Sequence, residues 1–310
     1  MIIDNFHNCY NATFKITNAL LNKIKLPAVL RLVILQSANV IIPLVFKFQT
    51  KNDSFQLNNN KQKANVVVSL TSFPNRISKI HLVIESIFRQ SILPSRVILW
   101  LSKEQFDSIE LLPETLLKLR DRGLEVYLTN GDLRSFKKYY YFLKDNPNTP
   151  FIIIDDDVFY KSNVIANLLE TNNQYPNAVC ANRCAIIDNT KPYSDWSYLK
   201  GNAIAPQFNL LPTGCGGVLY PQGSLHTDVL NSELFTNTCK DADDIWLNCC
   251  AYLNDSLIAY TGHNEYLLEV KSNNNVHLHT KNVGESNNDL RIKQVREYYL
   301  NNKSIDVFER

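Results

Sequence analysis

Residues 150–160 read Pro-Phe-Ile-Ile-Ile-Asp-Asp-Asp-Val-Phe-Tyr, so an apolar run leads straight into three carboxylates, Asp155, Asp156 and Asp157. The run is too short for a helix and rich in β-branched residues, which is typical of a strand that a parallel sheet buries on both faces. Such sheets bind ligands at the carboxyl ends of their strands. Neighbouring acids repel one another unless a cation relieves them, and their oxygens suit Mg²⁺ or Mn²⁺. The stretch favours a metal–diphosphate site, but an acidic turn that caps the next helix would contain the same residues.

Strands and helices alternate on both sides of this stretch. Buried-type strands are predicted at residues 64–70, 95–101, 124–128 and 178–181. Helices are predicted at residues 77–90 and 162–170. Strands that alternate with helices imply right-handed crossovers, and therefore a mostly parallel sheet covered by helices on both faces. The predicted fold class is α/β.

The composition indicates a globular protein with no general affinity for nucleic acid. Of 310 residues, 45% are hydrophobic and 20% are charged, and the net charge of +2 provides no basic field. The seven cysteines have neither CxxC nor Cys/His zinc spacing, so we expect reduced, mostly buried thiols. Because the first residues do not form a secretory signal either, we expect a cytoplasmic protein.

Residues 1–60 are predicted to form a helical extension and a linker ahead of an α/β domain at residues 61–310. Residues 26–46 have the length of a membrane span, but Arg31 and several polar residues interrupt them, and lysines flank them. We therefore expect a helix that lies on the inner membrane face or packs on the domain, rather than a true span. The polar, Asn-rich stretch 49–63 places the boundary.

Two loops carry candidate binding residues. Lys137 and Lys138 precede the acidic strand, where they would either face a diphosphate or lie on a solvated helix face. Residues 188–212 form a long, irregular, aromatic stretch that contains Trp196. Long loops of this kind are usually functional.

A glycine-rich turn and a histidine pair follow. Gly214, Gly216 and Gly217 lack the spacing of a P-loop or a dinucleotide fingerprint. They would permit close approach of the backbone to a ligand, or simply form a tight turn. His277 and His279 have strand spacing and so share one face, as a structural pair or as metal ligands.

Asp243 and Asp244 form a second acidic cluster at the beginning of an apolar helix. Acids in a first helical turn interact with the helix dipole, and an Asp there is often only a cap. In a chain that also carries the first acidic cluster, one of the two would also serve as a general base.

Taken together, these residues resemble the GT-A-fold glycosyltransferases, close to the family-2-like bacterial enzymes of capsule and lipopolysaccharide synthesis. The resemblance runs from about Val66 to His279. The matching motifs are Ser-Leu-Thr-Ser-Phe-Pro-Asn-Arg at 69–76, the DXD element within 154–157, Thr-Gly-Cys-Gly-Gly at 213–217 and Asp-Asp-Ile-Trp-Leu at 243–247. The resemblance implies a GT-A sheet and metal-dependent transfer from a nucleotide-diphosphate sugar to a saccharide or lipid-linked saccharide.

The resemblance also implies a metal site. Asp155 and Asp157 would hold Mn²⁺ or Mg²⁺ bridging the nucleotide diphosphate, with Asp156 near the ribose. A late histidine binds the metal in some GT-A enzymes, and the motif does not choose between His277 and His279.

The remaining roles follow in the same way. Asp244 matches the base of inverting members, with Asp243 as second choice. The pair is Asp-Asp rather than Glu-Asp, and no Gln-x-x-Arg-Trp motif follows, which argues for transfer of single sugars. The donor residues would be Thr71, Phe73, Arg76, Lys137, Lys138 and Asp156. The acceptor residues would be Trp196, Gly214, Gly216 and Gly217.

Two alternatives remain open at this point. Strand-borne aspartates with Mg²⁺ also serve nucleotidyl and phosphoryl transferases. The aromatic loop and the apolar N-terminal stretch would also suit a non-catalytic protein that binds carbohydrate or membrane.

Overall fold

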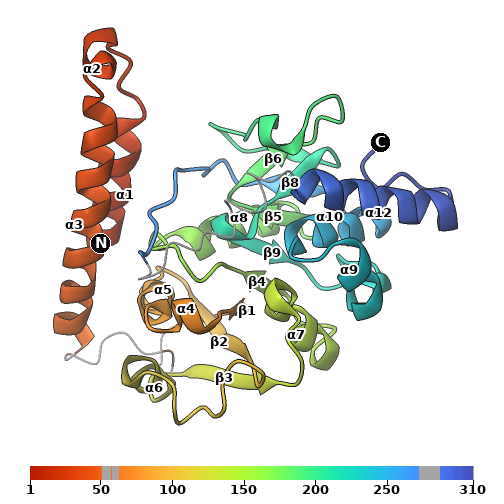
Figure 1. Ribbon diagram of the computed structural model, residues 1–310, viewed down its shortest axis with the longest axis horizontal. Helices are drawn as coiled ribbons and strands as arrows, with labels where there is room; N and C mark the ends of the chain where they lie inside the picture. The colour runs from red at the N-terminus through yellow and green to blue at the C-terminus, as the bar shows by residue number, and fades with distance from the viewer. Residues whose placement is uncertain (51–56, 58–62, 272–286, 310) are drawn as a thin grey trace.

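The structure, a computed structural model, describes residues 1–50, 57, 63–271 and 287–309. Its strands are β1 (Lys63–Thr71), β2 (Leu93–Ser102), β3 (Leu124–Thr129), β4 (Phe151–Ile153), β5 (Val179–Ala181), β6 (Cys184–Ile186), β7 (Ile204–Gln207), β8 (Leu210–Pro212), β9 (Val218–Tyr220) and β10 (Ile258–Tyr260). Eight of them form one sheet in the order β3-β2-β1-β4-β9-β5-β10-β7, and β6 pairs with β8 (Figure 1).

The sheet is mostly parallel, as predicted, with two antiparallel strands. β1 lies between β2 and β4 and is parallel to both, and β3 continues the parallel half. β9 runs antiparallel to β4 and β5, and β7 runs antiparallel to β10. The backbone hydrogen bonds of a sheet can form between parallel or antiparallel strands, so they do not decide the direction of β9. The α/β class is therefore confirmed, while the antiparallel β9 at the centre of the sheet was not predicted.

Helices cover both faces of the sheet because its strands bury side chains on both. In β1, Val66, Val68 and Leu70 belong to one hydrophobic cluster, while Val67 belongs to the other. This is the two-residue period of a strand. The first cluster includes side chains of α5 (Ile80–Ile87), α6 (Glu114–Arg120) and α8 (Val164–Gln174). The second includes side chains of α7 (Tyr140–Asp145), α9 (Ser232–Thr238), α10 (Asp243–Leu253) and α12 (Asn287–Lys303).

Short elements complete the fold. The helix α4 (Pro74–Ile77) follows β1 directly, so the chain turns at once at the carboxyl end of the central strand. Single 3₁₀ turns are η1 (Arg134–Lys138), η2 (Tyr193–Asp195), η3 (Gly214–Gly216) and η4 (Thr227–Leu230).

The N-terminal residues form a helical hairpin of α1 (Ile2–Thr13), α2 (Ala19–Lys23) and α3 (Leu26–Thr50). Figure 1 shows it along one side of the molecule, with α2 projecting beyond the rest. Ala38, Ile42 and Phe46, one helical turn apart, are buried in the same cluster as one face of the sheet. The hairpin thus packs on the sheet domain. The boundary predicted near residue 60 falls outside the described residues and stays a prediction.

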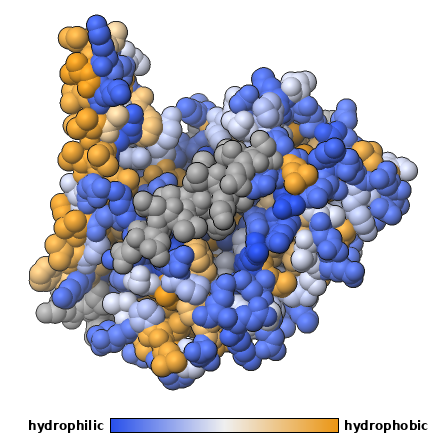
Figure 2. Space-filling view, in the orientation of Figure 1, coloured by the Kyte–Doolittle hydropathy of each residue, from blue (hydrophilic) through white to orange (hydrophobic). Residues whose placement is uncertain are grey.

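The opposite side of α3 is apolar and exposed. Figure 2 shows hydrophobic surface along this edge of the molecule. The exposed large hydrophobic residues of α3 are Val29, Leu30, Leu32, Val33, Val40, Ile41, Leu44 and Phe48. By length and composition Leu26–Gln49 would be able to cross a membrane. We call this the outer face of α3.

Candidate active site

The acidic run lies at the carboxyl ends of β1 and β4, the edge that the sequence predicted. Asp156 is buried, and its two carboxylate oxygens accept hydrogen bonds from Ser72 Oγ and Arg76 Nη1, both at 2.6 Å. Arg76 Nη1 also lies 2.9 Å from Asp157 Oδ2. The first residues after β1 therefore hold two of the three aspartates in place.

Lys138 lies between the two acidic clusters and contacts both. Its Nζ lies 2.5 Å from Asp155 Oδ1 and 3.1 Å from Asp243 Oδ2. The main chain at Lys138 is tied to the sheet, because Ser69 Oγ donates to its carbonyl and in turn accepts a bond from Trp100 Nε1. Lys138 is itself buried. The sequence alternative of a solvated basic face is wrong for this residue.

Asp243 and Asp244 begin α10, and they have different environments. Asp243 is buried against Lys138, whereas Asp244 is only partly buried and its Oδ1 accepts from the Gly214 amide at 3.0 Å. The residue at the cap position is Ala242, without a side-chain cap bond. Neither aspartate is therefore the helix cap that the sequence left as an alternative.

Gly214 joins the two clusters. A Cβ atom there would lie 3.3 Å from Asp244 Oδ1 and 3.4 Å from Asp155 Oδ1. Both carboxylates thus border the same glycine. A larger residue would push into the space where the two acidic side chains approach each other.

Burial and crowding change the protonation of these groups. Burial and then Asp243 raise the pKa of Asp244 to about 8, against the lowering effect of Lys138. Burial, opposed by Arg76 and reinforced by Asp155, raises the pKa of Asp157 to about 7. Burial alone would lower the pKa of Lys138, but the surrounding aspartates raise it well above its usual value. The site holds more negative charge than its two cations balance.

This excess predicts a pH-dependent stability in the absence of metal. Native Asp244 keeps its proton up to a pKa of about 8, whereas the unfolded carboxyl loses it near 3.8. Between these values the native state binds more protons, so stability falls as pH rises. We expect the melting temperature of the metal-free protein to fall between pH 5 and pH 8. The fall should be smaller in Asp244→Asn, and equal falls in both proteins would contradict the assignment.

The carboxylates fit a divalent cation. Hard oxygens and an excess of negative charge are what Mg²⁺ and Mn²⁺ require, and few protein ligands suffice when phosphate and water complete the shell. In the described part of the chain, no three His, Cys, Asp or Glu side chains converge as a ready-made cage. His277 and His279 lie outside the described residues. Asp155 and Asp157 are therefore the candidates that can be placed.

The other predicted donor residues line the same edge or support it. Thr71 Oγ1 donates to the Trp100 carbonyl at 2.8 Å, and the Arg76 guanidinium lies 5.4 Å from the centre of the Phe73 ring. Lys137 is buried and pairs with Asp132 instead of the acidic run. Burial lowers the pKa of Lys137, against that pairing.

The predicted acceptor residues lie in and after the stretch 188–212. Contrary to the prediction, this stretch is not irregular throughout, because it contains η2, β7 and β8. Trp196 is 7% exposed, and its Nε1 donates to the Asp188 carbonyl at 2.9 Å, so it anchors its own loop. Gly217 has a φ of +85°, which favours glycine. A Cβ on Gly216 would lie 2.6 Å from the Cβ of Arg183. Sequence reasoning did not identify Arg183, since a single arginine after a short strand carries no pattern.

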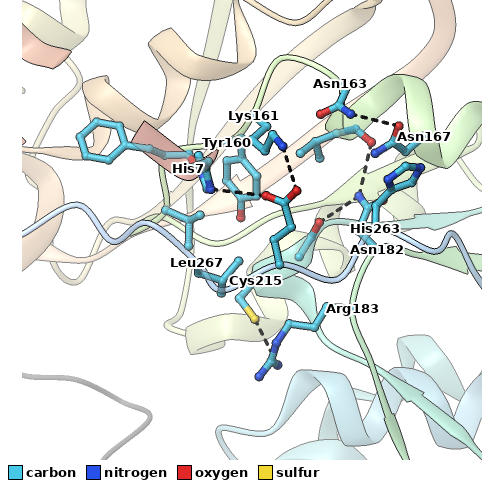
Figure 3. Close-up of a pocket in the computed structure, with 15 residues that line it drawn as sticks. His7, Tyr160, Lys161, Asn163, Asn167, Asn182, Arg183, Cys215, His263 and Leu267 are labelled. Atoms are coloured by element: carbon cyan, nitrogen blue, oxygen red, sulfur yellow. Dashed lines mark hydrogen bonds and ion pairs between the residues drawn. The ribbon is translucent and has the colours of Figure 1, made fainter. Parts of the chain in front are cut away.

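A cavity of about 50 Å³ lies beside residues 158–161, which follow the acidic run. Figure 3 shows His7, Lys161, Cys215 and His263 among the residues around it. Its volume suits one or two water molecules rather than a nucleotide. His7 Nε2 lies 2.5 Å from the Phe159 carbonyl, so the N-terminal hairpin contacts the segment that follows the acidic run.

Comparison with known proteins yielded structural neighbours only. No family model and no curated protein matches the chain. A mannosyltransferase from Pyrobaculum calidifontis in complex with GDP-Man and Mn²⁺ is 13% identical, with 89% of this chain and 77% of that chain covered and a TM-score of 0.45. TarS 1–349 from S. aureus is 12% identical, with 78% and 73% covered and a TM-score of 0.44.

A third neighbour is of another kind. The UTP-bound UGPase from Acinetobacter baumannii is 13% identical, with 79% of this chain and 96% of that chain covered and a TM-score of 0.42. Similarities this low carry no conclusion about function, which therefore rests on the site itself.

Proposed function

We propose that the chain is a nucleotide-sugar-dependent glycosyltransferase that moves one sugar to a saccharide or lipid-linked saccharide. The observation that carries this proposal is the meeting of Asp155 and Asp244 at Gly214, both within 3.4 Å of the position that a Cβ on this glycine would take. A candidate metal ligand and a partly exposed carboxylate thus flank one point. Displacement of a diphosphate by a hydroxyl needs a charged site for the leaving group next to a base.

On this proposal Asp155 and Asp157 hold Mn²⁺ or Mg²⁺, which when bound stabilises negative charge on the departing diphosphate. Lys138 and Arg76 lie beside these carboxylates and would neutralise phosphate oxygens. Asp156 is the proposed ribose contact. Its bonds to Ser72 and Arg76 would fix the orientation of its carboxylate.

Asp244 is the proposed base. In its ionised form, which a cation bound beside it would favour, it takes the proton of the acceptor hydroxyl as that oxygen forms a bond to the anomeric carbon. The bond from this carbon to the diphosphate oxygen breaks, and the nucleoside diphosphate leaves with the electron pair. A single displacement of this kind inverts the anomeric carbon. The Gly214 amide, 3.0 Å from Asp244 Oδ1, would orient the carboxylate for this step.

A screen of nucleotide sugars for released nucleotide tests the proposal. We expect Mn²⁺-dependent release of UDP or GDP from one donor, accelerated by a saccharide acceptor. Release of pyrophosphate from a nucleoside triphosphate and a sugar phosphate would instead assign a nucleotidyl transferase. Carbohydrate binding without consumption of any donor would assign a non-catalytic protein.

We also propose that the outer face of α3 contacts the cytoplasmic face of the membrane. The exposed apolar residues lie on one continuous helix side, with Lys23, Lys25 and Lys47 near its ends. An apolar face with flanking lysines suits the interface of a membrane with anionic lipids. Such contact would bring the site near a lipid-linked acceptor.

Substitution of the outer face tests this contact. Leu32, Val40 and Phe48 are 55%, 61% and 69% exposed, so glutamate at all three should leave the fold intact. We expect wild type to sediment with anionic vesicles, and the triple Glu variant to stay largely in the supernatant. Leu111→Glu, at a residue 74% exposed elsewhere on the surface, is the matched control. Equal sedimentation of all three proteins would refute the membrane contact.

A further inference from the structure

We propose that Arg183 binds an anionic group, a phosphate or a carboxylate, that the acceptor carries. This rests on the proposed transferase function and names the substrate class of the same site. Arg183 follows β5 and precedes β6 directly, so it lies at the end of a strand on the far side of β9 from β4.

The tripeptide Thr213–Cys215 lies between Arg183 and the proposed base, Asp244, and contacts both. Arg183 Nη1 donates to Thr213 Oγ1 at 2.9 Å and lies 3.7 Å from Cys215 Sγ. Gly214, between these two residues, donates its amide to Asp244. In Figure 3 the Arg183 side chain extends past Cys215 and away from Lys161. A molecule that contacts both Arg183 and Asp244 therefore needs to span only one short turn.

In the part of the chain that the structure describes, Arg183 forms no ion pair. Among residues 1–50, 57, 63–271 and 287–309, no carboxylate lies within 4.0 Å of its guanidinium. Arg76 and Lys138, the cations of the donor side, each contact two carboxylates. The groups around Arg183 are neutral near pH 7: burial raises the pKa of Cys215 to about 11, and burial also raises the pKa of Tyr193. A largely enclosed cation among neutral groups favours an anionic ligand.

The guanidinium is also held in one orientation. Its central carbon lies 3.6 Å from the centre of the Tyr198 ring, a stacking distance. Tyr198 is fixed in turn by a backbone bridge to Ala185. A Cβ on Gly216 would lie 2.6 Å from Arg183 Cβ, so a glycine at 216 is what lets the η3 turn approach Arg183 this closely. A planar donor fixed in this way is preorganised for a planar or tetrahedral oxyanion.

The acceptor is the favoured source of this anion rather than the donor. The donor diphosphate would lie at Asp155 and Asp157, beside Lys138 and Arg76, at the ends of β1 and β4. Arg183 lies on the other side of Gly214 and Asp244, toward β6 and β8. Tyr193 and Tyr198 adjoin it there, and aromatic faces stack well on sugar rings.

A pair of matched sugars tests the inference. Glucose 6-phosphate and glucose are titrated by calorimetry into the full chain, both alone and saturated with Mn²⁺ and UDP or GDP. We expect the nucleotide-loaded wild type to bind glucose 6-phosphate at least about tenfold more tightly than glucose, as charge-assisted bonds imply. Arg183→Gln should lose this preference. Arg183→Lys should keep part of it, because lysine keeps the charge without the planar fork.

Arg291→Gln is the matched control, because Arg291 is also a half-buried arginine without a carboxylate within 4.0 Å in the described residues. It should bind glucose 6-phosphate as wild type does. Undiminished binding by Arg183→Gln, or no preference in wild type, overturns the inference. If Arg183→Gln loses affinity for UDP or GDP, Arg183 binds a phosphate of the donor instead, and the acceptor assignment is overturned. If wild type binds neither nucleotide, the transferase proposal fails, while the titration of nucleotide-free protein still decides whether Arg183 is an anion site.

Discussion

Asp244→Asn is expected to lower transferase turnover by on the order of 10²–10⁴-fold, the usual effect of removing a general base. The variant should fold, because the asparagine oxygen can still accept the bond from the Gly214 amide. Nucleotide affinity in the presence of Mn²⁺ should stay close to that of wild type, since in the proposed mechanism Asp244 contacts the acceptor. The measurement is turnover with the donor identified by the nucleotide screen, beside the melting temperature.

Asp243→Asn is the matched control, because the two residues are adjacent and both acidic. Asp243 is buried and pairs with Lys138, so its loss should lower the melting temperature more than Asp244→Asn does. Its turnover should fall less. Nearly normal turnover in Asp244→Asn would refute the base assignment. An inactive Asp243→Asn beside an active Asp244→Asn would instead move the base by one residue.

Asp155→Asn and Asp157→Asn are expected to abolish the metal dependence of nucleotide binding. Loss of outer-shell partners of a metal costs 10–100-fold in affinity, so loss of a direct ligand should cost about 100-fold or more. Both variants should fold: Lys138 keeps Asp243 when Asp155 changes, and Arg76 keeps Asp156 when Asp157 changes. Without metal, Asp157→Asn should even be more stable than wild type near pH 8, since it removes one crowded, buried charge.

Calorimetry of UDP and GDP with and without Mn²⁺ measures the first effect, and thermal melting measures the second. Glu125→Gln is the control, because Glu125 pairs with Arg96 at the remote edge of the sheet. It should bind nucleotide and metal as wild type does. Wild-type binding that is equally tight without metal would refute the metal site.

The sequence was sufficient to predict the parallel half of the sheet. The strands β1, β2 and β4 are apolar runs that are buried on both faces, and helical patterns separate several of the strands. The edge strand β3 is buried on one face only, and its alternating pattern was visible in the sequence. The strands β6, β8 and β10 have three residues each, which is too short for a period to be visible. β9 follows a glycine-rich turn, and a strand's direction in a sheet is decided by contacts far away in the sequence.

The chemistry of the site was also visible in part. Acidic runs next to buried apolar residues are costly, and this identified Asp155, Asp157 and Asp244 as candidates. That Asp155 and Asp244 meet at Gly214 depends on how β4, β9 and α10 pack, which no local pattern contains. For Lys138 the sequence predicted a diphosphate partner or a solvated face, and its contacts with Asp155 and Asp243 were not predicted. The metal roles and the two histidines stay predictions.

The contacts that α1 and α3 make with later parts of the chain have a consequence for synthesis and folding. His7 reaches the Phe159 carbonyl, and Asp4 accepts bonds from the amide and hydroxyl of Ser162. Asn39 bonds the main chain of Glu269 and Lys271. These helices thus leave the ribosome before the segments that they bind, which follow them by more than 150 residues. Until then the sides that face these later segments have no native cover, so we expect these helices to associate with lipid or a chaperone during translation, and to dock last.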